Sequence, residues 1–286
     1  MKAASFGYMN AVELDEALQA LARGEGAAKA MSGGQSLGPM LNLRLARPPQ
    51  VIDIAGLPAL RQVKAVPEGI EIGAGVTHAE IEDGLHALLV GHPMQGVAAG
   101  IAYRAIRNRG TVGGSLAHAD PAADWVVALP ALGAQVRLRS PRRERSVEAA
   151  GFMLGAYTTV LEPDELVTAV VVPRHTSTTR WGYHKLCRKP GEFAKASAAV
   201  YLDEATGASR IVLGAVDGPP VLLDTLAKAV AQDGASAASR AHLRAAVAAA
   251  LPERDSIDLK MFTACLERAL EQAGVIARAT ATGAPS

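Results

Sequence analysis

Two glycine pairs, far apart in the sequence, constrain this chain more than any other feature. The first lies in SGGQSLGPML, residues 32–41, and the second in TVGGSLAHADPAAD, residues 111–124. Consecutive glycines let a backbone turn sharply and point several N–H groups at one spot, with no Cβ atom to keep a ligand away. Such a group of amides binds phosphate oxygens. We therefore predict that the two segments face each other and hold a pyrophosphate from both sides; the alternative, that each pair is only a tight turn, stays open.

Polar side chains in both segments would strengthen such a site. Hydroxyl and amide groups that could bind the same anion belong to Ser32, Gln35, Ser36, Thr111 and Ser115. The spacing is not that of a Rossmann fingerprint, because GGQSLG at 33–38 lacks the G-x-G-x-x-G pattern and GAGVTH at 73–78 has two of its three glycines. No G-x-x-x-x-G-K-[ST] motif occurs either, which excludes a P-loop.

The balance of charge narrows the class of partner. A chain of 286 residues is expected to form one large or two medium domains. Lys and Arg total 29 and Asp and Glu total 28, so the formal net charge is +1. This balance argues against nucleic acid and anionic membrane surfaces, since both attract clustered basic charge. The basic run RLRSPRRERS at 137–146 is predicted to be a solvated hairpin or an interface with an acidic partner.

Cysteine usage and the termini exclude several further classes. Cys187 and Cys265 form no C-x-x-C pair, so this chain alone cannot build a zinc site or a cysteine-ligated iron–sulfur cluster. The N-terminus lacks the apolar core of a signal peptide, and no apolar run reaches the length of a transmembrane helix. The spacing supports no Ser-His-Asp or Cys-His arrangement. We therefore expect a cytoplasmic protein with no catalytic residue and no metal ligands of its own.

Hydrophobic periodicity predicts an α+β chain. Helices are expected over residues 12–24, 77–92, 94–110, 121–133, 235–251 and 259–273. Strands are expected over residues 28–31, 49–56, 134–140, 164–173, 181–189, 195–203 and 209–224, with a hairpin over 60–76. The polar segment RHTSTTR at 174–180 has no periodicity and predicts a linker between two units, near residues 1–176 and 177–280. The tail, residues 281–286, is expected to be disordered.

Three ordered segments carry a resemblance to a known family. They are AKAMSGGQSLGPMLNLRLARPPQVIDI at 28–54, IRNRGTVGGSLAHADPAADW at 106–125 and FMLGAYTTVLEPDELVTAVVVP at 152–173. Together they resemble the FAD-binding medium subunit of molybdenum hydroxylases, the relatives of carbon monoxide dehydrogenase, xanthine dehydrogenase and aldehyde oxidase. The resemblance implies an FAD-binding domain of the vanillyl-alcohol-oxidase (PCMH) type with subdomains at about 1–57 and 58–176. It also implies a small C-terminal α+β domain, a three-stranded sheet with helices, at 177–280.

The same resemblance implies which residues contact FAD. The first glycine segment would wrap the pyrophosphate and the second would lie on its other side. Asp124 would lie near the adenosine ribose, Val167 would pack on the nucleotide, Lys185 would approach the flavin, and Phe193 would stack on the isoalloxazine ring, where some relatives carry Tyr. The full set is Ala30, Met31, Ser32, Gly33, Gly34, Gln35, Ser36, Leu37, Thr111, Val112, Gly113, Gly114, Ser115, Asp124, Val167, Lys185 and Phe193.

Plainer interpretations of these residues stay open. Asp124 would also suit the start of a helix, Val167 a buried strand and Lys185 a solvated strand. The functional alternative for Lys185 has a physical reason, because a lysine beside the flavin would stabilise the anionic reduced form of the flavin. His78 is expected in a surface turn and His118 in the loop beyond the second glycine pair, and neither is assigned a chemical role.

The resemblance finally implies a place in a larger complex. FAD would be bound without a covalent link. A large partner subunit would carry molybdopterin cytosine dinucleotide, and a small one two [2Fe-2S] clusters that pass electrons to FAD. An external acceptor, such as quinone, NAD or O₂, would then take them. The expected assembly is a dimer of heterotrimers, a heterohexamer, with any membrane association made through the complex. The alternatives are a self-sufficient FAD-dependent oxidase or reductase of the same fold and a non-enzymatic binding module.

Overall fold

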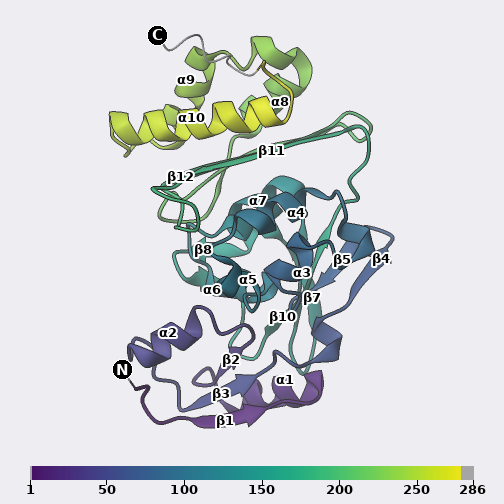
Figure 1. The fold of residues 1–286 in the computed structure, drawn as a ribbon, viewed down its shortest axis with the longest axis vertical. Helices are drawn as coiled ribbons and strands as arrows, with labels where there is room; N and C mark the ends of the chain where they lie inside the picture. The colour runs from purple at the N-terminus through teal and green to yellow at the C-terminus, as the bar shows by residue number, and fades with distance from the viewer. Residues whose placement is uncertain (1, 278–286) are drawn as a thin grey trace.

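The computed structural model describes residues 2–277, so the predicted tail lies outside the described residues. The chain forms three units that follow one another along the long axis of the molecule (Figure 1). An N-terminal unit, drawn in purple, lies at one end, a middle unit in blue and teal follows, and a C-terminal unit in green and yellow lies at the other end. The α+β class expected from the sequence is confirmed.

The N-terminal unit is a small parallel sheet covered by a helix. Its strands pair in the order β1-β3-β2. Helix α1 packs on it through buried alanine and leucine side chains at helical spacing. Strand β1 was not expected from the sequence, because GYMN is short and mostly exposed and so carries no alternating pattern. The bounds are β1 Gly7–Asn10, α1 Leu14–Arg23, β2 Lys29–Met31, α2 Leu37–Asn42 and β3 Gln50–Asp53.

The middle unit is an antiparallel sheet with helices on one face. Its strand order is β4-β5-β10-β6-β7, so the predicted hairpin over 60–76 is present as β4 and β5. The strands are β4 Val63–Val66, β5 Gly69–Gly73, β6 Gln135–Arg139, β7 Glu144–Glu148, β8 Met153–Gly155, β9 Thr158–Thr159 and β10 Leu166–Val172. The helices are α3 His78–Glu82, α4 Pro93–Gly100, α5 Arg104–Arg107, α6 Val112–His118 and α7 Asp124–Leu132, and short 3₁₀ turns span Pro58–Leu60, Ala87–Leu89 and Ala149–Gly151.

The helices of this unit differ from the sequence expectation in two places. The helices expected over 77–92 and 94–110 are both interrupted, because Gly84, Gly91 and Ala102 have φ angles of +65°, +74° and +42°. A helix cannot continue through the left-handed region. Residues 112–118, which were expected as a loop, form helix α6 after the N-cap Thr111.

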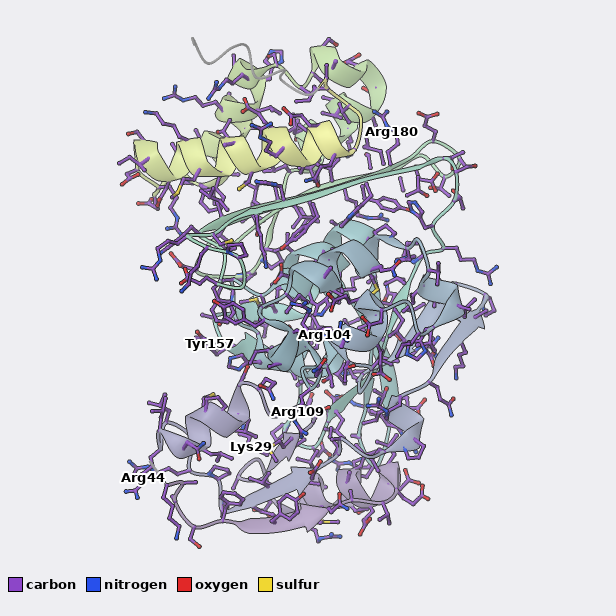
Figure 2. The ribbon with its side chains drawn as sticks, in the orientation of Figure 1. Lys29, Arg44, Arg104, Arg109, Tyr157 and Arg180 are labelled. Atoms are coloured by element: carbon purple, nitrogen blue, oxygen red, sulfur yellow. The ribbon has the colours of Figure 1, made fainter. Side chains whose placement is uncertain are left out.

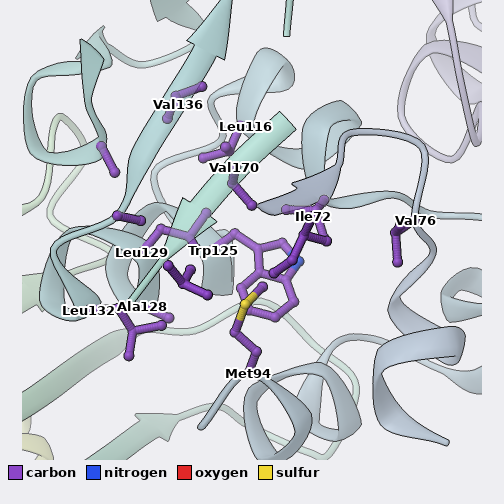
Figure 3. Close-up of a cluster of buried hydrophobic side chains, with 14 of the residues drawn as sticks. Ile72, Val76, Met94, Leu116, Trp125, Ala128, Leu129, Leu132, Val136 and Val170 are labelled. Atoms are coloured by element: carbon purple, nitrogen blue, oxygen red, sulfur yellow. The ribbon is translucent and has the colours of Figure 1, made fainter. Parts of the chain in front are cut away.

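The core of the middle unit is built around Trp125 (Figure 3). Helix α7 is buried along its whole length, and the ring of Trp125 packs among aliphatic side chains that include Met94 and Ile72. The indole Nε1–H donates a 3.1 Å hydrogen bond to Nδ1 of His78, which is itself buried. His78 is therefore a neutral core residue at the start of α3, and the expected surface turn at this position is wrong.

The basic run at 137–146 is a hairpin, as one of the two interpretations predicted. Strands β6 and β7 pair across it. Its arginines form ion pairs with carboxylates of the same chain. Arg142 pairs with Asp164. Arg143 and Arg145 both pair with Glu165, whose side chain is buried. The pKa of the Glu165 carboxyl is lowered, chiefly by its hydrogen bonds from Arg145. The positive charge of the run is thus neutralised internally.

The C-terminal unit is an antiparallel sheet covered by helices. Its order is β11-β12-β13-β14, in which the three long strands match the expectation and the two-residue β14 extends the edge. Strand β12 is buried throughout, because α10 covers one face of the sheet and α7 the other. The bounds are β11 Thr179–Leu186, β12 Ala196–Asp203, β13 Ala208–Gly214, β14 Val221–Leu222, α8 Asp224–Asp233, the 3₁₀ turn Gly234–Ser236, α9 Arg240–Ala250 and α10 Ser256–Gln272.

The contact between α10 and β11 is unusually close. A Cβ atom on Gly182 would lie 1.8 Å from the carbonyl oxygen of Ala269, so only glycine allows the helix to approach the strand here. Between residues 2 and 277, none of the helices combines the length and the apolar character that a bilayer crossing requires.

Two buried histidines should make the free energy of unfolding depend on pH. Burial, and less strongly the charge of Arg107, lowers the pKa of His78 to about 4 from 6.5. Burial likewise lowers the pKa of His92 to about 4. Between pH 6.5 and 4 these histidines bind protons in the unfolded chain but stay neutral in the folded chain. The free energy of unfolding is therefore highest above pH 6.5 and falls as the pH drops. At pH 5 each histidine should lower the free energy of unfolding by about 2 kcal/mol relative to its value at neutral pH.

Urea denaturation at pH 7 and pH 5 measures this loss. The variant His78→Gln keeps an acceptor for Trp125 and should lose about half of the pH dependence, because only His92 then remains. An unchanged difference between the two pH values in that variant would contradict the assignment.

Candidate functional site

The two glycine segments meet where the N-terminal unit touches the middle unit. The hydroxyl of Thr111 donates a 3.2 Å hydrogen bond to the hydroxyl of Ser32. A Cβ atom on Gly33 would lie 1.9 Å from the carbonyl oxygen of Arg109, so the two backbones are in direct contact. Figure 2 shows Arg109 between the two units. The segments therefore face each other, as the sequence predicted.

The first glycine segment offers unused amide groups. It connects β2 to α2 and is half-buried except for the buried Gly33. Among the described residues, the N–H groups of residues 33–36 have no backbone acceptor. Gly34 has a φ of +69°, the left-handed conformation that is typical of anion-binding turns of successive N–H groups. This loop can bind an anion through its backbone.

The second glycine segment is built differently, and the expectation of an open amide group there is wrong. The N–H groups of Val112 and Gly113 donate to the carbonyl oxygens of Val76 and Ala74, at 3.1 and 2.9 Å. Those of Gly114 and Ser115 donate to the side chain and the carbonyl of Thr111. All four donors are thus used within the protein. What remains for a ligand is the hydroxyl of Ser115 and the exposed, Cβ-free surface of Gly114.

Arg109 is a site residue that the sequence analysis did not single out. Its Nε donates to the carbonyl oxygen of Gly33 at 3.4 Å, and the side chain is exposed. Arg104 and Arg107, on the same segment, are held by Glu82 and Asp83, whereas Arg109 forms no ion pair with the described residues. The signal was a cation directly before the Gly-Thr that opens the second segment. Its guanidinium supplies the positive charge that the second segment's amides do not.

Asp124 and Lys185 form one buried ion pair. The Nζ of Lys185 donates to Oδ1 of Asp124 at 2.7 Å, and the hydroxyl of Tyr183 donates to the same oxygen at 2.8 Å. Burial, followed by the charge of Asp124, raises the pKa of Tyr183 well above its usual value, so this phenol stays a donor. The structure thus joins two residues that the resemblance assigned to different parts of a ligand. Tyr183 lies two positions before Lys185 on β11, and that spacing puts both on one face of the strand.

Val167 and Phe193 lie in contrasting environments. Val167, on β10, is 5% exposed and belongs to the core of the middle unit, which matches the interpretation as a buried strand residue. Phe193 is 67% exposed, in the loop between β11 and β12. In the same loop Gly191 lies against the ring of Tyr103, which is also exposed. An exposed aromatic face is therefore available beside the end of β11.

The remaining candidates take supporting positions. His118 ends helix α6 and lies against the ring of Tyr157, with ring centroids 5.2 Å apart. Cys187 and Cys265 are both free thiols. Within residues 2–277, no group of three or more His, Cys, Asp or Glu side chains is arranged to hold a metal ion. The free N–H groups of the first segment, the guanidinium of Arg109 and the hydroxyl of Ser115 support the binding of an anionic ligand.

Comparison with known proteins identifies the family to which the chain is similar. A family model described as the FAD binding domain in molybdopterin dehydrogenase matches residues 4–175. The nicotine 6-hydroxylase medium subunit of Paenarthrobacter nicotinovorans is 37% identical over 219 residues, 76% of each chain. The carbon monoxide dehydrogenase medium chain of Hydrogenophaga pseudoflava is 37% identical over 200 residues, 69% of each chain. The structure of a reconstituted CO dehydrogenase from Oligotropha carboxidovorans superposes with a TM-score of 0.85 at 31% identity, over 96% of this chain and 99% of that one.

Removal of Lys185 should destabilise the protein through Asp124. The variant Lys185→Met leaves a buried carboxylate without its cation, which should cost about 3 kcal/mol of unfolding free energy. The double variant Lys185→Met/Asp124→Asn removes the stranded charge and should recover most of that loss. The control Lys189→Met breaks an exposed ion pair with Glu192 and should cost less than about 1 kcal/mol. Urea titration of the four proteins tests the pair; equal losses in both lysine variants would show that the buried contact contributes nothing.

Proposed function

Because the chain belongs to the family of FAD-binding domains in molybdopterin dehydrogenases, we propose that it is the FAD-carrying medium subunit of a molybdopterin-dependent hydroxylase or dehydrogenase complex. The observation that carries this proposal is the loop of unbonded amides at 33–36, which faces Arg109 across the contact between the two units. Two relatives that are 37% identical to this chain are named as the medium subunit of nicotine 6-hydroxylase and the medium chain of carbon monoxide dehydrogenase.

The residues present fit the pyrophosphate of FAD. A pyrophosphate carries negative charge on both phosphates and accepts many hydrogen bonds. Within residues 2–277, the N–H groups of the loop have no backbone acceptor and Arg109 forms no ion pair, and Ser115 offers a hydroxyl from the other side. Gly34 and Gly114 leave room for a close approach, because neither carries a Cβ atom. We propose that FAD is held here without a covalent bond.

Each side of the site would then have a distinct role. The first segment and Arg109 would fix the phosphates, Phe193 would present an aromatic surface to the isoalloxazine ring, and the Lys185–Asp124 pair would lie beyond the phosphates at the end of β11. Because Asp124 compensates the charge of Lys185, this pair is neutral as a unit and affects the potential of a nearby flavin less than a free lysine would.

Bound FAD supplies redox chemistry that links one-electron carriers to a two-electron acceptor. We propose that a small partner subunit with two [2Fe-2S] clusters delivers the electrons. A large partner subunit with molybdopterin cytosine dinucleotide would hold the organic substrate. The proposed assembly is a dimer of heterotrimers, and the final acceptor is an external molecule such as quinone, NAD or O₂. This chain's own part is to bind FAD, hold its phosphates and present its ring.

Two measurements test this function. The purified chain should show the visible absorption of bound flavin, and the cofactor should be released on denaturation in the form of FAD. Alcohols or NADPH added to the isolated chain should leave the flavin oxidised, because electrons arrive through partner subunits. A colourless chain that also fails to bind added FAD would overturn the proposal, and rapid flavin reduction without partners would replace it with a self-sufficient oxidoreductase.

Gly33→Ala should weaken FAD binding by separating the two segments. The added methyl group would overlap the carbonyl of Arg109, a rigid backbone atom, so the loop must shift and its amides lose their alignment. We expect the FAD dissociation constant to rise at least about tenfold, measured by quenching of flavin fluorescence. Gly96→Ala, in helix α4, is the matched control, because a Cβ atom there meets nothing within 4 Å. Equal affinities in the two variants would contradict the geometry.

Arg109→Gln should weaken FAD binding through loss of charge. A charge-assisted hydrogen bond to a phosphate contributes roughly 1.5–3 kcal/mol, so the dissociation constant should rise about tenfold to a hundredfold and depend less on salt. Arg104→Gln, on the same segment but committed to Asp83 and Glu82, should bind FAD like the unmodified chain. If both variants keep the unmodified affinity, Arg109 has no part in holding the phosphates.

A further inference from the structure

A tyrosine at the tip of the β8–β9 hairpin is exposed and has an unusual backbone conformation. Tyr157 lies in the turn between the two strands and is 63% exposed. Its φ angle is +59°, in the left-handed region that residues other than glycine rarely adopt. Such conformations persist where surrounding contacts impose them, and they are concentrated at ligand sites. Residues 118–120 supply the contacts that fix this tyrosine.

The backbone, the ring and the hydroxyl of Tyr157 each contact the end of helix α6. The N–H of Tyr157 donates a 2.8 Å hydrogen bond to the carbonyl oxygen of Ala119. Its ring lies against the imidazole of His118, with ring centroids 5.2 Å apart. The charge of Asp120, followed by partial burial and a hydrogen bond to that carboxylate, raises the pKa of the phenol, which therefore stays protonated at neutral pH. We call Tyr157, His118 and Asp120 the α6 platform.

Helix α6 connects this platform to the proposed phosphate site. Ser115 and His118 are three positions apart on the helix, and Gly114 and His118 are four apart, so all three lie on one face. That face is accessible, since Gly114 is exposed and the other two residues are half-buried. One turn of helix rises roughly 5 Å. A group bound by the hydroxyl of Ser115 therefore lies about one turn away from the ring of His118.

The turn that follows the platform leads to the Lys185–Asp124 pair. Residues 119–123 connect α6 to α7, and Asp124 at the start of α7 accepts the hydrogen bond of Lys185. Within the turn, the carbonyl oxygen of Pro121 accepts a 3.1 Å hydrogen bond from the N–H of Ala215, which follows β13. Strands β11, β12 and β13 pair so that Lys185 and the last residue of β13 lie at the same end of the sheet. The α6 platform therefore lies between the proposed phosphate site and the end of β11.

We propose that the α6 platform binds the ribityl chain of FAD, through hydrogen bonds of the Tyr157 hydroxyl and the Asp120 carboxylate to the hydroxyl groups of that chain. This inference rests on the proposed function, in which the first glycine segment and Arg109 hold the phosphates and Phe193 faces the isoalloxazine ring. The ribityl chain joins the inner phosphate to the ring, so it has to cross the surface between these two places. Figure 2 shows Tyr157 nearer to the C-terminal unit than Arg109 is, as this path requires.

The groups of the α6 platform suit a sugar alcohol. A phenol donates one hydrogen bond and accepts others, and a carboxylate accepts from several hydroxyl groups, which is the complement of a chain of hydroxyls. An adenine base could also stack on a tyrosine ring. The adenosine of FAD, however, extends from the outer phosphate, whereas the platform lies on the side of the flavin ring. A platform that is ordered before binding also loses less entropy when the ligand binds.

Binding of FAD and of ADP to the full chain separates the two halves of the cofactor. ADP contains the adenosine and both phosphates of FAD but neither the ribityl chain nor the ring. Tyr157→Ala should raise the dissociation constant of FAD about tenfold, measured by quenching of flavin fluorescence, and should change that of ADP, measured by competition with FAD, by less than about twofold. Tyr157→Phe, which loses only the hydroxyl, should show most of the same loss. Arg109→Gln should weaken both ligands, because both carry the phosphates.

Tyr8→Ala is the matched control for Tyr157→Ala. Tyr8, on β1, is 59% exposed, and its hydroxyl also donates to a carboxylate, at 2.6 Å from Oδ2 of Asp53. This variant should bind both ligands like the unmodified chain. Equal FAD affinities of the two alanine variants overturn the inference, as does a loss of ADP affinity in Tyr157→Ala as large as its loss of FAD affinity, which would put the adenosine on the platform. An unmodified chain that binds neither FAD nor ADP would instead overturn the proposed function.

Discussion

The contact between Gly33 and the carbonyl of Arg109 is the constraint on which the site depends. It brings the N-terminal unit against the middle unit, and the hydrogen bond from Thr111 to Ser32 closes the same junction. The second segment is fixed in turn by its pairing with residues 74–78, through Val76, Ala74 and an isolated bridge between Thr77 and Thr111. Because these bonds, together with those to Thr111, use up the second segment's backbone donors, the open backbone donors come from the first segment, and the second segment adds only the hydroxyl of Ser115.

Local patterns in the sequence were enough to predict most of the strands and the meeting of the two glycine segments. Alternation and apolar runs are properties of neighbouring residues, so the sheets of the middle and C-terminal units could be read directly. The sequence could not show whether the N–H groups of the second glycine segment are free or hydrogen-bonded. Its sequence looks like an open loop, but the acceptors of Val112 and Gly113 belong to residues more than thirty positions earlier. Only the folded chain shows that these two N–H groups are satisfied.

Long-range pairing also explains the other differences. Asp124 and Lys185 are 61 positions apart, and neither sequence context reveals that the two side chains meet. His78 follows a glycine-rich turn and yet is buried, where it accepts the hydrogen bond of the Trp125 indole N–H from 47 positions later in the chain. The interrupted helices follow the same logic, since an apolar periodicity continues through Gly84 and Gly91 although their backbone angles end the helix.

The core of the middle unit does not stop where its strands stop. Tyr201 of β12 belongs to it, and Trp181, Tyr183 and Ala208 pack against its edge. The boundary proposed near residue 176 therefore divides the chain in sequence but not in packing. A fragment that ended there would expose to water the side of α7 that packs on β12 and β13, so the C-terminal unit completes the core of the FAD-binding domain.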